Sequence, residues 1–287
     1  MAVVLIVGGT GFLGAELVRR AARRGHTTHA THRQRPIAAD VAPTATWHPL
    51  DVTDAEAVAA LLDAVRPDVV ANAAYQQNGP DVDAICNVGA ASLASACAAV
   101  DARFVHVSTD LVFDGTLGRS YTEADEPSPI MAYGQAKLDG EQSVLDALAS
   151  ALVVRTSIIY GSPDAPQEQL MRRALADDSI AFFTDEYRSP VHVTDLAEAL
   201  LDLADTAAAG VLHLGSASRV DRHAFACALA RHAGCDAAAL GSRTQDPALG
   251  PRPADVSLDS SAAATVLGRA LPGPVERLAQ ASTSDSS

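Results

Sequence analysis

A tyrosine and a lysine stand four residues apart in the segment Tyr133-Gly134-Gln135-Ala136-Lys137. On a helix this spacing puts the phenol and the ammonium on one face, where the positive charge favours the phenolate. An ordinary tyrosine titrates at about pH 10, too high for ready proton exchange at neutral pH, so a catalytic tyrosine needs such a neighbour. Lys137 is the only lysine in a chain that otherwise uses arginine. The pattern therefore predicts a catalytic pair rather than a surface pair.

Hydroxyl and carboxyl groups follow a second predicted element. Ser108, Thr109 and Asp110 come directly after the apolar run Phe104 to Val107, which reads as a strand. Ligands collect at the carboxyl ends of strands in an open parallel sheet, so we expect these side chains to face a ligand cleft, where one hydroxyl can hold a carbonyl oxygen. The alternative for each residue is a cap or turn position.

A glycine-rich turn joins the first strand to the first helix. Its sequence is Gly8-Gly9-Thr10-Gly11-Phe12-Leu13-Gly14. A dinucleotide pyrophosphate needs backbone N–H groups at a helix N-terminus, and glycines let the phosphate approach without meeting a Cβ. The turn predicts a dinucleotide site, as opposed to a simple tight turn. Its binding residues are Gly8, Gly11, Phe12, Leu13 and Gly14.

The end of the second strand distinguishes the two nicotinamide cofactors. An acidic residue there binds a free ribose 2′-OH, but this chain has His32-Arg33-Gln34-Arg35 instead. A guanidinium fork suits a phosphate dianion, so His32, Arg33 and Arg35 favour NADPH, with NADH left open. The alternative is a solvated basic loop.

Further cofactor contacts are expected along the same edge of the sheet. Asp51 and Val52 follow a short third strand, where they can meet the adenine, and Asn72-Ala73-Ala74 ends the fourth, where small residues let the backbone run beside the cofactor. The remaining predicted cofactor-binding residues are Ser108, Tyr133 and Lys137. We assign no metal-binding residue.

Apolar runs and helical patterns alternate through the first 160 residues. A buried strand over Ala2 to Val7 precedes a helix that Gly25 ends, and the same alternation continues to a strand over Leu152 to Thr156. This rhythm predicts an α/β fold with a doubly wound parallel sheet, the Rossmann type, and a smaller C-terminal lobe. We expect a dinucleotide-binding domain over 1–160, to which the chain returns around 189–215, a substrate-binding lobe over 161–280, and a disordered tail over 281–287.

Charge and composition limit the partners of this 287-residue chain. Its formal net charge of −14 repels polyanions, and the arginines from Arg19 to Arg24 read as a solvated helix face, so we expect no nucleic-acid partner. The apolar start is far shorter than the roughly 20 residues that span a bilayer, so we expect no membrane partner. Four cysteines without a CxxC pair suit a reducing cytoplasm. A homodimer is left open.

Taken together, these residues resemble the extended short-chain dehydrogenase/reductases, most closely the dTDP-4-dehydrorhamnose reductase group. The likeness spans about residues 1–230. Beyond the glycine-rich turn, the stretches that carry it are Ser108-Thr109-Asp110-Leu111-Val112-Phe113-Asp114-Gly115, Tyr121, Glu123, Pro127, Pro129, Tyr133 to Glu141, Arg155-Thr156-Ser157, Tyr160-Gly161 and Arg188 to Ala197.

The resemblance implies a reductase of the 4-keto group of a dTDP-linked deoxysugar. In it, Tyr133 is the general acid, Lys137 orients Tyr133 and binds the nicotinamide ribose, and Thr109 holds the substrate oxygen. Asp110 and Tyr133 also contact the substrate, and Arg188 binds its diphosphate, the alternative for Arg188 being a structural ion pair. The substrate is thus a small molecule, and the implied class is an NAD(P)-dependent oxidoreductase.

The sequence differs from the family pattern at two places, and two alternative functions remain open. Met131 replaces an asparagine common in the group, and the segment Tyr75 to Asp81 differs from the usual loop. Leu111 stands where related 4,6-dehydratases carry a glutamate, which argues against dehydration. The alternatives are an NAD-dependent sugar-nucleotide epimerase, disfavoured by the missing acid after the second strand, and a non-catalytic nucleotide-binding regulatory subunit like the beta subunit of methionine adenosyltransferase.

Overall fold

The computed structural model describes residues 1–246, 248 and 250–284, and seven strands and five longer helices form the first of its two units. The strands are β1 (Val3–Val7), β2 (Thr27–His32), β3 (Thr46–Pro49), β4 (Val69–Asn72), β5 (Arg103–Thr109), β6 (Leu152–Thr156) and β11 (Gly210–His213). The helices are α1 (Phe12–Arg23), α2 (Ala55–Val65), α3 (Gly89–Val100), α4 (Ala132–Ala147) and α6 (Val193–Ala204), with short turns η1 (Ala42–Thr44) and η2 (Ala84–Val88).

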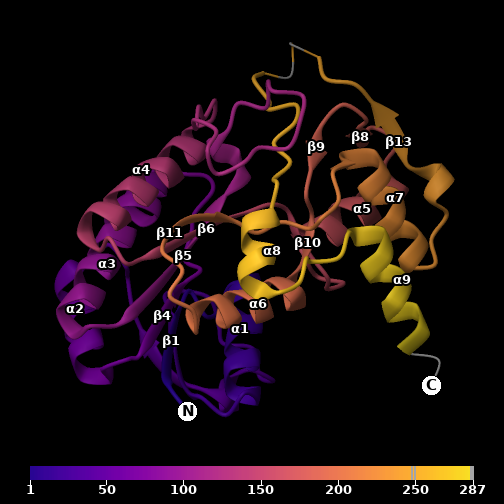
Figure 1. Cartoon of the computed structure of the whole chain (residues 1–287). Coiled ribbons are helices and arrows are strands. Elements are labelled where there is room, and N and C mark those ends of the chain that lie inside the picture. Colours follow the sequence, from indigo (N-terminus) through magenta and orange to yellow (C-terminus); the bar gives the residue numbers. More distant parts are fainter. Residues whose placement is uncertain (247, 249, 285–287) are drawn as a thin grey trace. The chain divides into compact units, whose positions relative to one another are not determined.

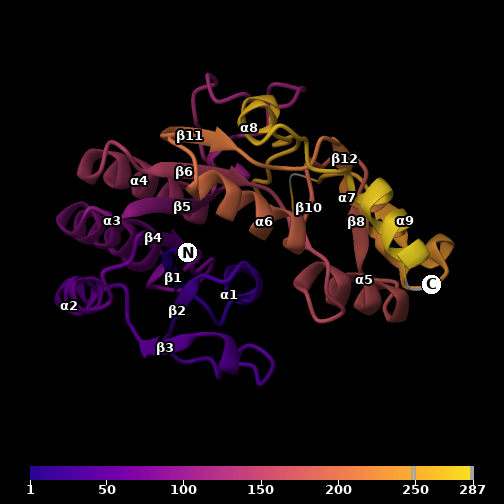
Figure 2. The ribbon, with the colours of Figure 1, turned by 60° about the horizontal axis from the view of Figure 1, so that its bottom comes forward.

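The strands make one sheet in the order β11-β6-β5-β4-β1-β2-β3. Its pairs β1–β2, β2–β3, β1–β4 and β4–β5 are parallel. Helices α2, α3 and α4 cover one face and α1 and α6 the other (Figures 1 and 2). Both faces are therefore buried, which is why β1 is a continuous apolar run. The predicted doubly wound α/β fold is confirmed.

The strand order reverses between β1 and β4. From β1 the chain proceeds outward to β2 and β3, and then returns to the other side of β1 as β4. Loops leaving the carboxyl ends of such neighbouring strands diverge, and open α/β sheets bind ligands at this switch point. Gly8 follows β1 and Ala73 follows β4, so two predicted binding segments start there.

A second unit consists of shorter elements. Its strands are β7 (Ile159–Tyr160), β8 (Ala181–Phe183), β9 (Tyr187–Arg188), β10 (Val191–His192), β12 (Val220–Asp221) and β13 (Gly241–Arg243), paired as three two-stranded sheets. Its helices are α5 (Pro166–Ala176), α7 (Arg222–His232), α8 (Ser261–Leu267) and α9 (Pro274–Ser284), with short turns η3 (Asp110–Val112) and η4 (Ala237–Ala239). Tyr160, Met171, Phe182, Phe225 and Leu278 meet in its apolar core.

The boundaries of the two units differ from the expected ones. The first comprises 1–109, 132–155 and 197–212, and the second 110–131, 156–196 and the chain from 213 onward. The return to the sheet begins within α6, later than the expected 189, because β10 pairs with β7 and stays outside the seven-stranded sheet. Of the expected tail, 281–284 continue α9, and 285–287 lie outside the described residues.

Arg19 and Arg20 of α1, and Arg24 directly after the helix, are paired. Arg20 and Arg24 both contact the carboxylate of Glu198 on α6, and Arg19 lies 2.8 Å from Asp40. These contacts neutralise what the sequence presents as a basic helix face. Within the described ranges, no helix is both long enough and apolar enough to cross a membrane.

Candidate functional site

The glycine-rich turn packs too closely for any side chain at two of its glycines. Gly8 has a φ of +80°, and an added Cβ would lie 2.8 Å from the backbone nitrogen of Ala74. A Cβ on Gly14 would lie 2.1 Å from the carbonyl oxygen of Gly8. Gly11 is the N-cap of α1 and has no side chain to cap the first N–H groups. The turn thus fits a diphosphate, because those N–H groups remain available to an anion.

A pocket of about 520 Å³ opens beside this turn. Its lining comes from the carboxyl ends of β1, β2, β3 and β4, the loops that follow them, and η2. The lining residues are Gly8, Thr10, Gly11, Thr31, His32, Arg33, Gln34, Arg35, Leu50, Val52, Ala73, Ala74, Tyr75, Gln76, Gln77, Asn78 and Ile85. The structure thus brings together eight of the residues predicted to bind the cofactor: Gly8, Gly11, His32, Arg33, Arg35, Val52, Ala73 and Ala74.

The two arginines at the end of β2 differ in their surroundings. Arg33 lies 3.5 Å from a carboxylate oxygen of Asp51 and 3.8 Å from one of Asp81. Arg35 is exposed on the same pocket. Asp51 is turned toward Thr53, whose N–H and hydroxyl it accepts, and these bonds together with Arg33 lower the pKa of Asp51. The carboxylate of Asp51 therefore stabilises the turn at Thr53 and lies beside the guanidinium of Arg33.

Other predicted cofactor residues lie outside the pocket lining. Phe12, Leu13 and Gly14 form the first turn of α1. Asn72 is 1% exposed, and its side chain accepts the N–H of Ala74 and points at His106. Ser108 donates its hydroxyl to Glu141, which also pairs with Arg155. The side chains of Asn72 and Ser108 therefore take part in buried hydrogen-bond networks behind the pocket.

The predicted Tyr–Lys pair lies on α4, as expected from its spacing. Tyr133 is half-buried, and its ring meets that of Tyr75 edge-on with centroids 6.3 Å apart. Lys137 is 1% exposed, and its Nζ donates to the Val107 carbonyl oxygen at 2.6 Å. Burial lowers the pKa of Lys137, although Cys86 and Glu141 act in the opposite direction. The lysine is therefore held inside the fold rather than in solvent.

Thr109, whose hydroxyl is predicted to hold the substrate oxygen, also belongs to the first unit. Thr109 is the last residue of β5 and is buried. It follows Val107 by two residues, so its side chain and that of Val107 leave the same face of the strand. Thr109, Tyr133 and Lys137 thus come from two neighbouring elements, β5 and α4, of the same compact unit.

Asp110 and Arg188 belong to the second unit. Asp110 is buried and accepts the hydroxyl of Ser157 at 2.6 Å. Arg188, also buried, donates to the carbonyl oxygens of Tyr187 and Pro253, and lies 3.9 Å from the fully buried Glu186. Arg188 therefore has structural partners, in keeping with the ion pair that the sequence left as its alternative.

Sequence reasoning missed a second arginine in this cluster. Arg222 begins α7, and its guanidinium donates to Gln167 at 3.1 Å. Burial, together with the charge of nearby Arg188, lowers the pKa of Arg222 to about 10. Arg188 and Arg222 lie 34 positions apart in a chain rich in arginine, so no spacing signal marks them as neighbours.

His106 and Tyr75 were missed as well. His106 is fully buried in β5, directly opposite Asn72 on β4, and its Nε2 is 3.2 Å from Nζ of Lys137. Tyr75 lies in the loop singled out as unusual, is 59% exposed and lines the pocket. A polar residue within the run Phe104 to Val107 is the one sequence signal for His106.

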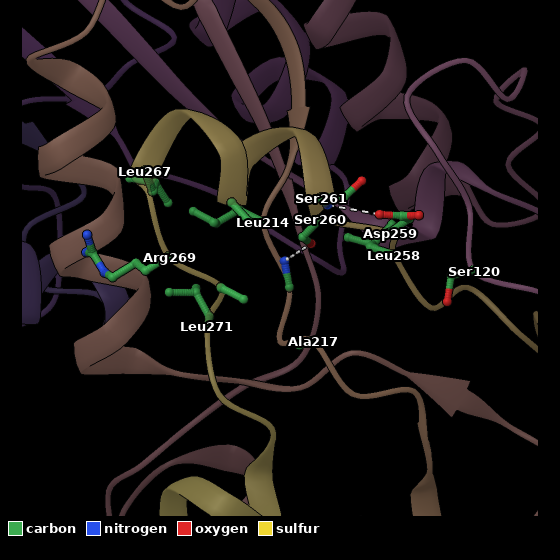
Figure 3. A pocket seen from close by; sticks show the side chains of 13 residues that line it. Ser120, Leu214, Ala217, Leu258, Asp259, Ser260, Ser261, Leu267, Arg269 and Leu271 are labelled. Atoms are coloured by element: carbon green, nitrogen blue, oxygen red, sulfur yellow. Dashed lines mark hydrogen bonds between the residues drawn. The ribbon is translucent and has the colours of Figure 1, made fainter.

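The second unit contains cavities of its own. One of about 390 Å³ is bounded by Leu214, Leu258, Leu267 and Leu271, with Ser260 accepting the N–H of Gly215 at 2.9 Å (Figure 3). None of the predicted site residues lines it. Throughout residues 1–246, 248 and 250–284, no group of three or more His, Cys, Asp or Glu side chains is placed to hold a metal ion.

The sheet order and the glycine-rich turn define a Rossmann-type α/β protein. Residues 1–284 match the family described as the RmlD substrate binding domain. The chain therefore belongs to this family, within the extended short-chain dehydrogenase/reductases.

Two known relatives and one solved structure are similar to this chain. The chain is 38% identical over 247 residues to dTDP-4-dehydrorhamnose reductase of Mycobacterium tuberculosis, covering 81% of this chain and 76% of that protein. It is 32% identical over 248 residues to methionine adenosyltransferase 2 subunit beta of Mus musculus, covering 79% and 71%. A crystal structure of dTDP-4-dehydrorhamnose reductase from Bacillus anthracis in complex with NADP superposes with a TM-score of 0.82, at 23% identity over 97% of this chain and 98% of that one.

Proposed function

We propose that this protein is an NADPH-dependent oxidoreductase that reduces the 4-keto group of a dTDP-linked deoxysugar. The observation that carries the proposal is the Tyr133–Lys137 pair on α4, with Lys137 buried and Tyr133 half-buried on the same helix. The M. tuberculosis relative, named for reduction of such a sugar, supports the substrate class.

The first unit is the cofactor-binding domain in this proposal. The N–H groups at the start of α1 hold the cofactor diphosphate, Gly8 and Gly14 keep the turn tight, and Val52, Ala73 and Ala74 line the remaining wall. Arg33 and Arg35 hold a 2′-phosphate, which distinguishes NADPH from NADH. NADH, which lacks the 2′-phosphate, would still bind through the adenine and diphosphate contacts.

Each catalytic role follows from where charge develops. The bound dihydronicotinamide supplies hydride to the ketone carbon. Thr109 donates its hydroxyl to the substrate oxygen as that oxygen becomes negative, and Tyr133 transfers its phenolic proton to the same oxygen. Lys137 orients Tyr133 and binds the ribose. A buried amine suits this role because its few polar partners fix its position.

The second unit is the substrate-binding lobe in this proposal. Asp110 contacts the sugar, and Arg188 offers positive charge to the substrate diphosphate, with Arg222 beside it. The net charge of −14 supports a small-molecule substrate over nucleic acid, and we place the protein in the cytoplasm. Sizing in solution decides whether it forms a homodimer.

A substrate panel tests the proposal. Purified protein is mixed with NADPH, then with NADH, and with dTDP-linked 4-keto-6-deoxysugars or small free ketones, while absorbance of the reduced cofactor is followed. We expect oxidation of NADPH only with the nucleotide-linked ketones. Consumption of cofactor with free ketones alone would contradict the proposed substrate.

A second candidate function comes from the similarity to subunit beta of methionine adenosyltransferase 2. A regulatory role predicts that the protein binds cofactor and leaves every ketone of the panel unreduced. An epimerase, the other alternative, would retain NAD through purification and release no net oxidised cofactor. The same panel, with cofactor content measured on the purified protein, separates these outcomes.

A further inference from the structure

Arg33 lies between two carboxylates that come from different segments of the first unit. Its Nε is 3.5 Å from Oδ2 of Asp51, in the segment after β3, and its Nη2 is 3.8 Å from Oδ2 of Asp81, in the loop between β4 and η2. Arg33 itself directly follows β2 and lines the pocket beside the glycine-rich turn. One guanidinium thus connects the segments that follow three strands of the sheet, next to the predicted cofactor site.

Both contacts of Arg33 are loose and open to water. The side chain of Arg33 is 35% exposed, and those of Asp51 and Asp81 are 43% and 52% exposed. Both distances exceed the roughly 2.7–3.2 Å of an N–H···O hydrogen bond. Exposed ion pairs of this kind contribute little to stability, because water competes for both partners. The guanidinium is therefore free to turn its N–H groups to a stronger acceptor, such as a phosphate dianion.

The charges of this cluster cancel. Arg33 and Arg35 carry two positive charges, and Asp51 and Asp81 carry two negative ones. Within the described ranges, no carboxylate lies at ion-pair distance from Arg35, so the contacts of both acids are with Arg33. A phosphate that approaches Arg33 competes with two carboxylates for the same N–H donors. Selection for a phosphate is then weaker than two arginines alone would give.

We propose that Asp81 is a specificity-determining residue for the cofactor: by engaging Arg33, it limits how strongly the chain prefers NADPH to NADH. The inference rests on the proposed function, in which Arg33 and Arg35 hold the 2′-phosphate. Specificity is a difference between two affinities, and a carboxylate that competes with the phosphate lowers the affinity for NADPH alone, because NADH has no phosphate there. Asp81 thus narrows the gap between the two cofactors.

Asp81 is the acid whose charge can be removed without disturbing a turn. The carboxylate of Asp51 accepts the N–H and the hydroxyl of Thr53, so its loss would alter the turn after β3. Asp81 is joined to the fold through its backbone carbonyl oxygen, which accepts the N–H of Ile85 at 3.0 Å. Asp81→Asn keeps this bond and the size of the side chain, and changes only the charge beside Arg33.

Titration calorimetry of the full chain with NADPH and with NADH tests the inference without any substrate. We expect Asp81→Asn to tighten NADPH binding about threefold or more, the scale of an exposed ion pair, and to leave NADH binding almost unchanged. The gain should shrink at high ionic strength, because salt screens exposed charges. In an Arg33→Ala background the same substitution should have a much smaller effect, because the competition is for that guanidinium.

Asp63→Asn is the matched control. Asp63 forms another exposed pair with an arginine, 3.5 Å from Nε of Arg66, and lies on α2, outside the pocket lining. Its substitution changes the net charge by the same one unit as Asp81→Asn. A gain in NADPH affinity common to both variants would therefore report the overall field of the protein and not the contact with Arg33. We expect Asp63→Asn to bind NADPH like the wild type.

The outcomes separate this inference from the proposed function. Tighter NADPH binding in Asp81→Asn, absent from Asp63→Asn and reduced by Arg33→Ala, supports the inference even if no ketone is reduced or the wild type binds both cofactors equally. Weaker NADPH binding in Asp81→Asn would overturn it, because Asp81 would then hold Arg33 in place for the phosphate. An unchanged ratio of the two affinities, an equal gain in Asp63→Asn or an undiminished gain with Arg33→Ala would overturn it as well. Absence of any cofactor binding would contradict the inference and the proposed function together.

Discussion

Arg155 and Glu141 form a buried ion pair between β6 and α4. Nη2 of Arg155 is 2.7 Å from Oε2 of Glu141, Nε is 3.1 Å from both carboxylate oxygens, and the two side chains are 5% and 3% exposed. Ser108 donates to the same carboxylate. The pair thus joins β6 to α4, the helix that carries Tyr133 and Lys137.

Breaking this pair should destabilise the protein. Glu141→Leu leaves the Arg155 guanidinium buried without its carboxylate, and we expect a loss of about 3–5 kcal/mol in the free energy of unfolding. The double variant Glu141→Leu, Arg155→Met removes both charges and should recover much of that loss. Urea denaturation followed by circular dichroism measures all three proteins.

The exposed pair of Arg66 and Asp63 is the control. Its side chains are 63% and 77% exposed, so Asp63→Ala should change stability by less than about 0.5 kcal/mol. Equal losses in Glu141→Leu and Asp63→Ala would show that burial of the Arg155–Glu141 pair contributes nothing special.

Cofactor preference should depend on Arg33 and Arg35. Each charge-assisted contact to a 2′-phosphate is worth roughly 1.5–3 kcal/mol where it is partly desolvated. We expect NADPH to bind more tightly than NADH, and Arg33→Ala, Arg35→Ala to remove most of the difference. Titration calorimetry with both cofactors measures it.

Arg23→Ala is the comparison for this prediction. Arg23 is an exposed arginine in the last turn of α1, away from the pocket lining, so its removal changes net charge by one unit without touching the pocket. Equal wild-type affinities for the two cofactors, or a double variant that keeps its preference, would count against NADPH selection by these arginines.

Loss of the Tyr133 hydroxyl should nearly abolish turnover. In Tyr133→Phe the ring and its contact with Tyr75 survive while the proton donor is lost, so cofactor affinity should stay close to the wild type. Lys137→Ala should damage both. Acid–base groups contribute about 10²–10⁴-fold, so more than about a tenth of wild-type turnover in Tyr133→Phe would contradict the role. Tyr75→Phe should lose far less.

Much of this architecture could be predicted because local pattern and global fold agree in the first unit. The β1–α1–β2 segment combines a buried apolar run, a glycine-rich turn and an amphipathic helix, and the structure has each within a residue or two of its expected bounds. The Tyr133–Lys137 spacing likewise predicted one helix face correctly. Both depend on neighbours in sequence.

The missed features depend on neighbours in space. Pro166 by itself reads as a break between elements, yet proline is well tolerated at the first helical position, and it begins α5. His106 gains its significance only from the β4–β5 register and from α4 packing behind it. The return of the chain around 189–215 predicted β10 in the main sheet, but β10 pairs with β7 instead. A strand of two residues is too short for its sequence to indicate which strand it pairs with.

Stability should fall with rising pH because of Glu168 on α5. Its Oε1 accepts the N–H groups of Gly161 and Ser162, but within the described part of the chain its buried Oε2 has no hydrogen-bond partner. Burial raises the pKa of Glu168, the backbone N–H groups only partly opposing it. Its contribution is therefore full below the unfolded-state value of about 4.3 and is lost as pH rises through the raised native value.

Glu168→Gln should remove this dependence. The variant keeps an oxygen for the two N–H groups and carries no charge, so we expect it to gain stability relative to the wild type between acid and neutral pH. Unfolding by urea at several pH values measures the difference, with the exposed first-turn residue in Glu56→Gln as the control. Parallel curves for wild type and Glu168→Gln would refute the prediction.

The last prediction concerns the diphosphate of the substrate. Arg188 is nearly buried, and its Nη atoms donate to the carbonyl oxygens of Tyr187, Ala254 and Pro253, so its charge is held in one place. A diphosphate bound there uses remote binding energy to position the ketone, which serves rate as well as affinity. We expect Arg188→Ala to lower kcat/KM for a nucleotide-linked keto sugar at least tenfold, and to leave that for a small free ketone almost unchanged.

Comparing the two substrates distinguishes a diphosphate-binding role of Arg188 from a structural one, and Arg222→Ala is the companion variant. The charge of Arg188 acts on Arg222, so both guanidinium groups can attract the same diphosphate. Arg222→Ala should therefore also affect only the nucleotide-linked substrate. If Arg188 is instead a structural residue, its removal deprives the buried Glu186 of one of its arginines and releases the Pro253 segment. Arg188→Ala would then lower the free energy of unfolding and reduce both substrates' kcat/KM equally, because the whole lobe would be loosened. The ratio of the two kcat/KM values therefore decides the role, since a structural loss cancels in that ratio and a lost diphosphate contact does not.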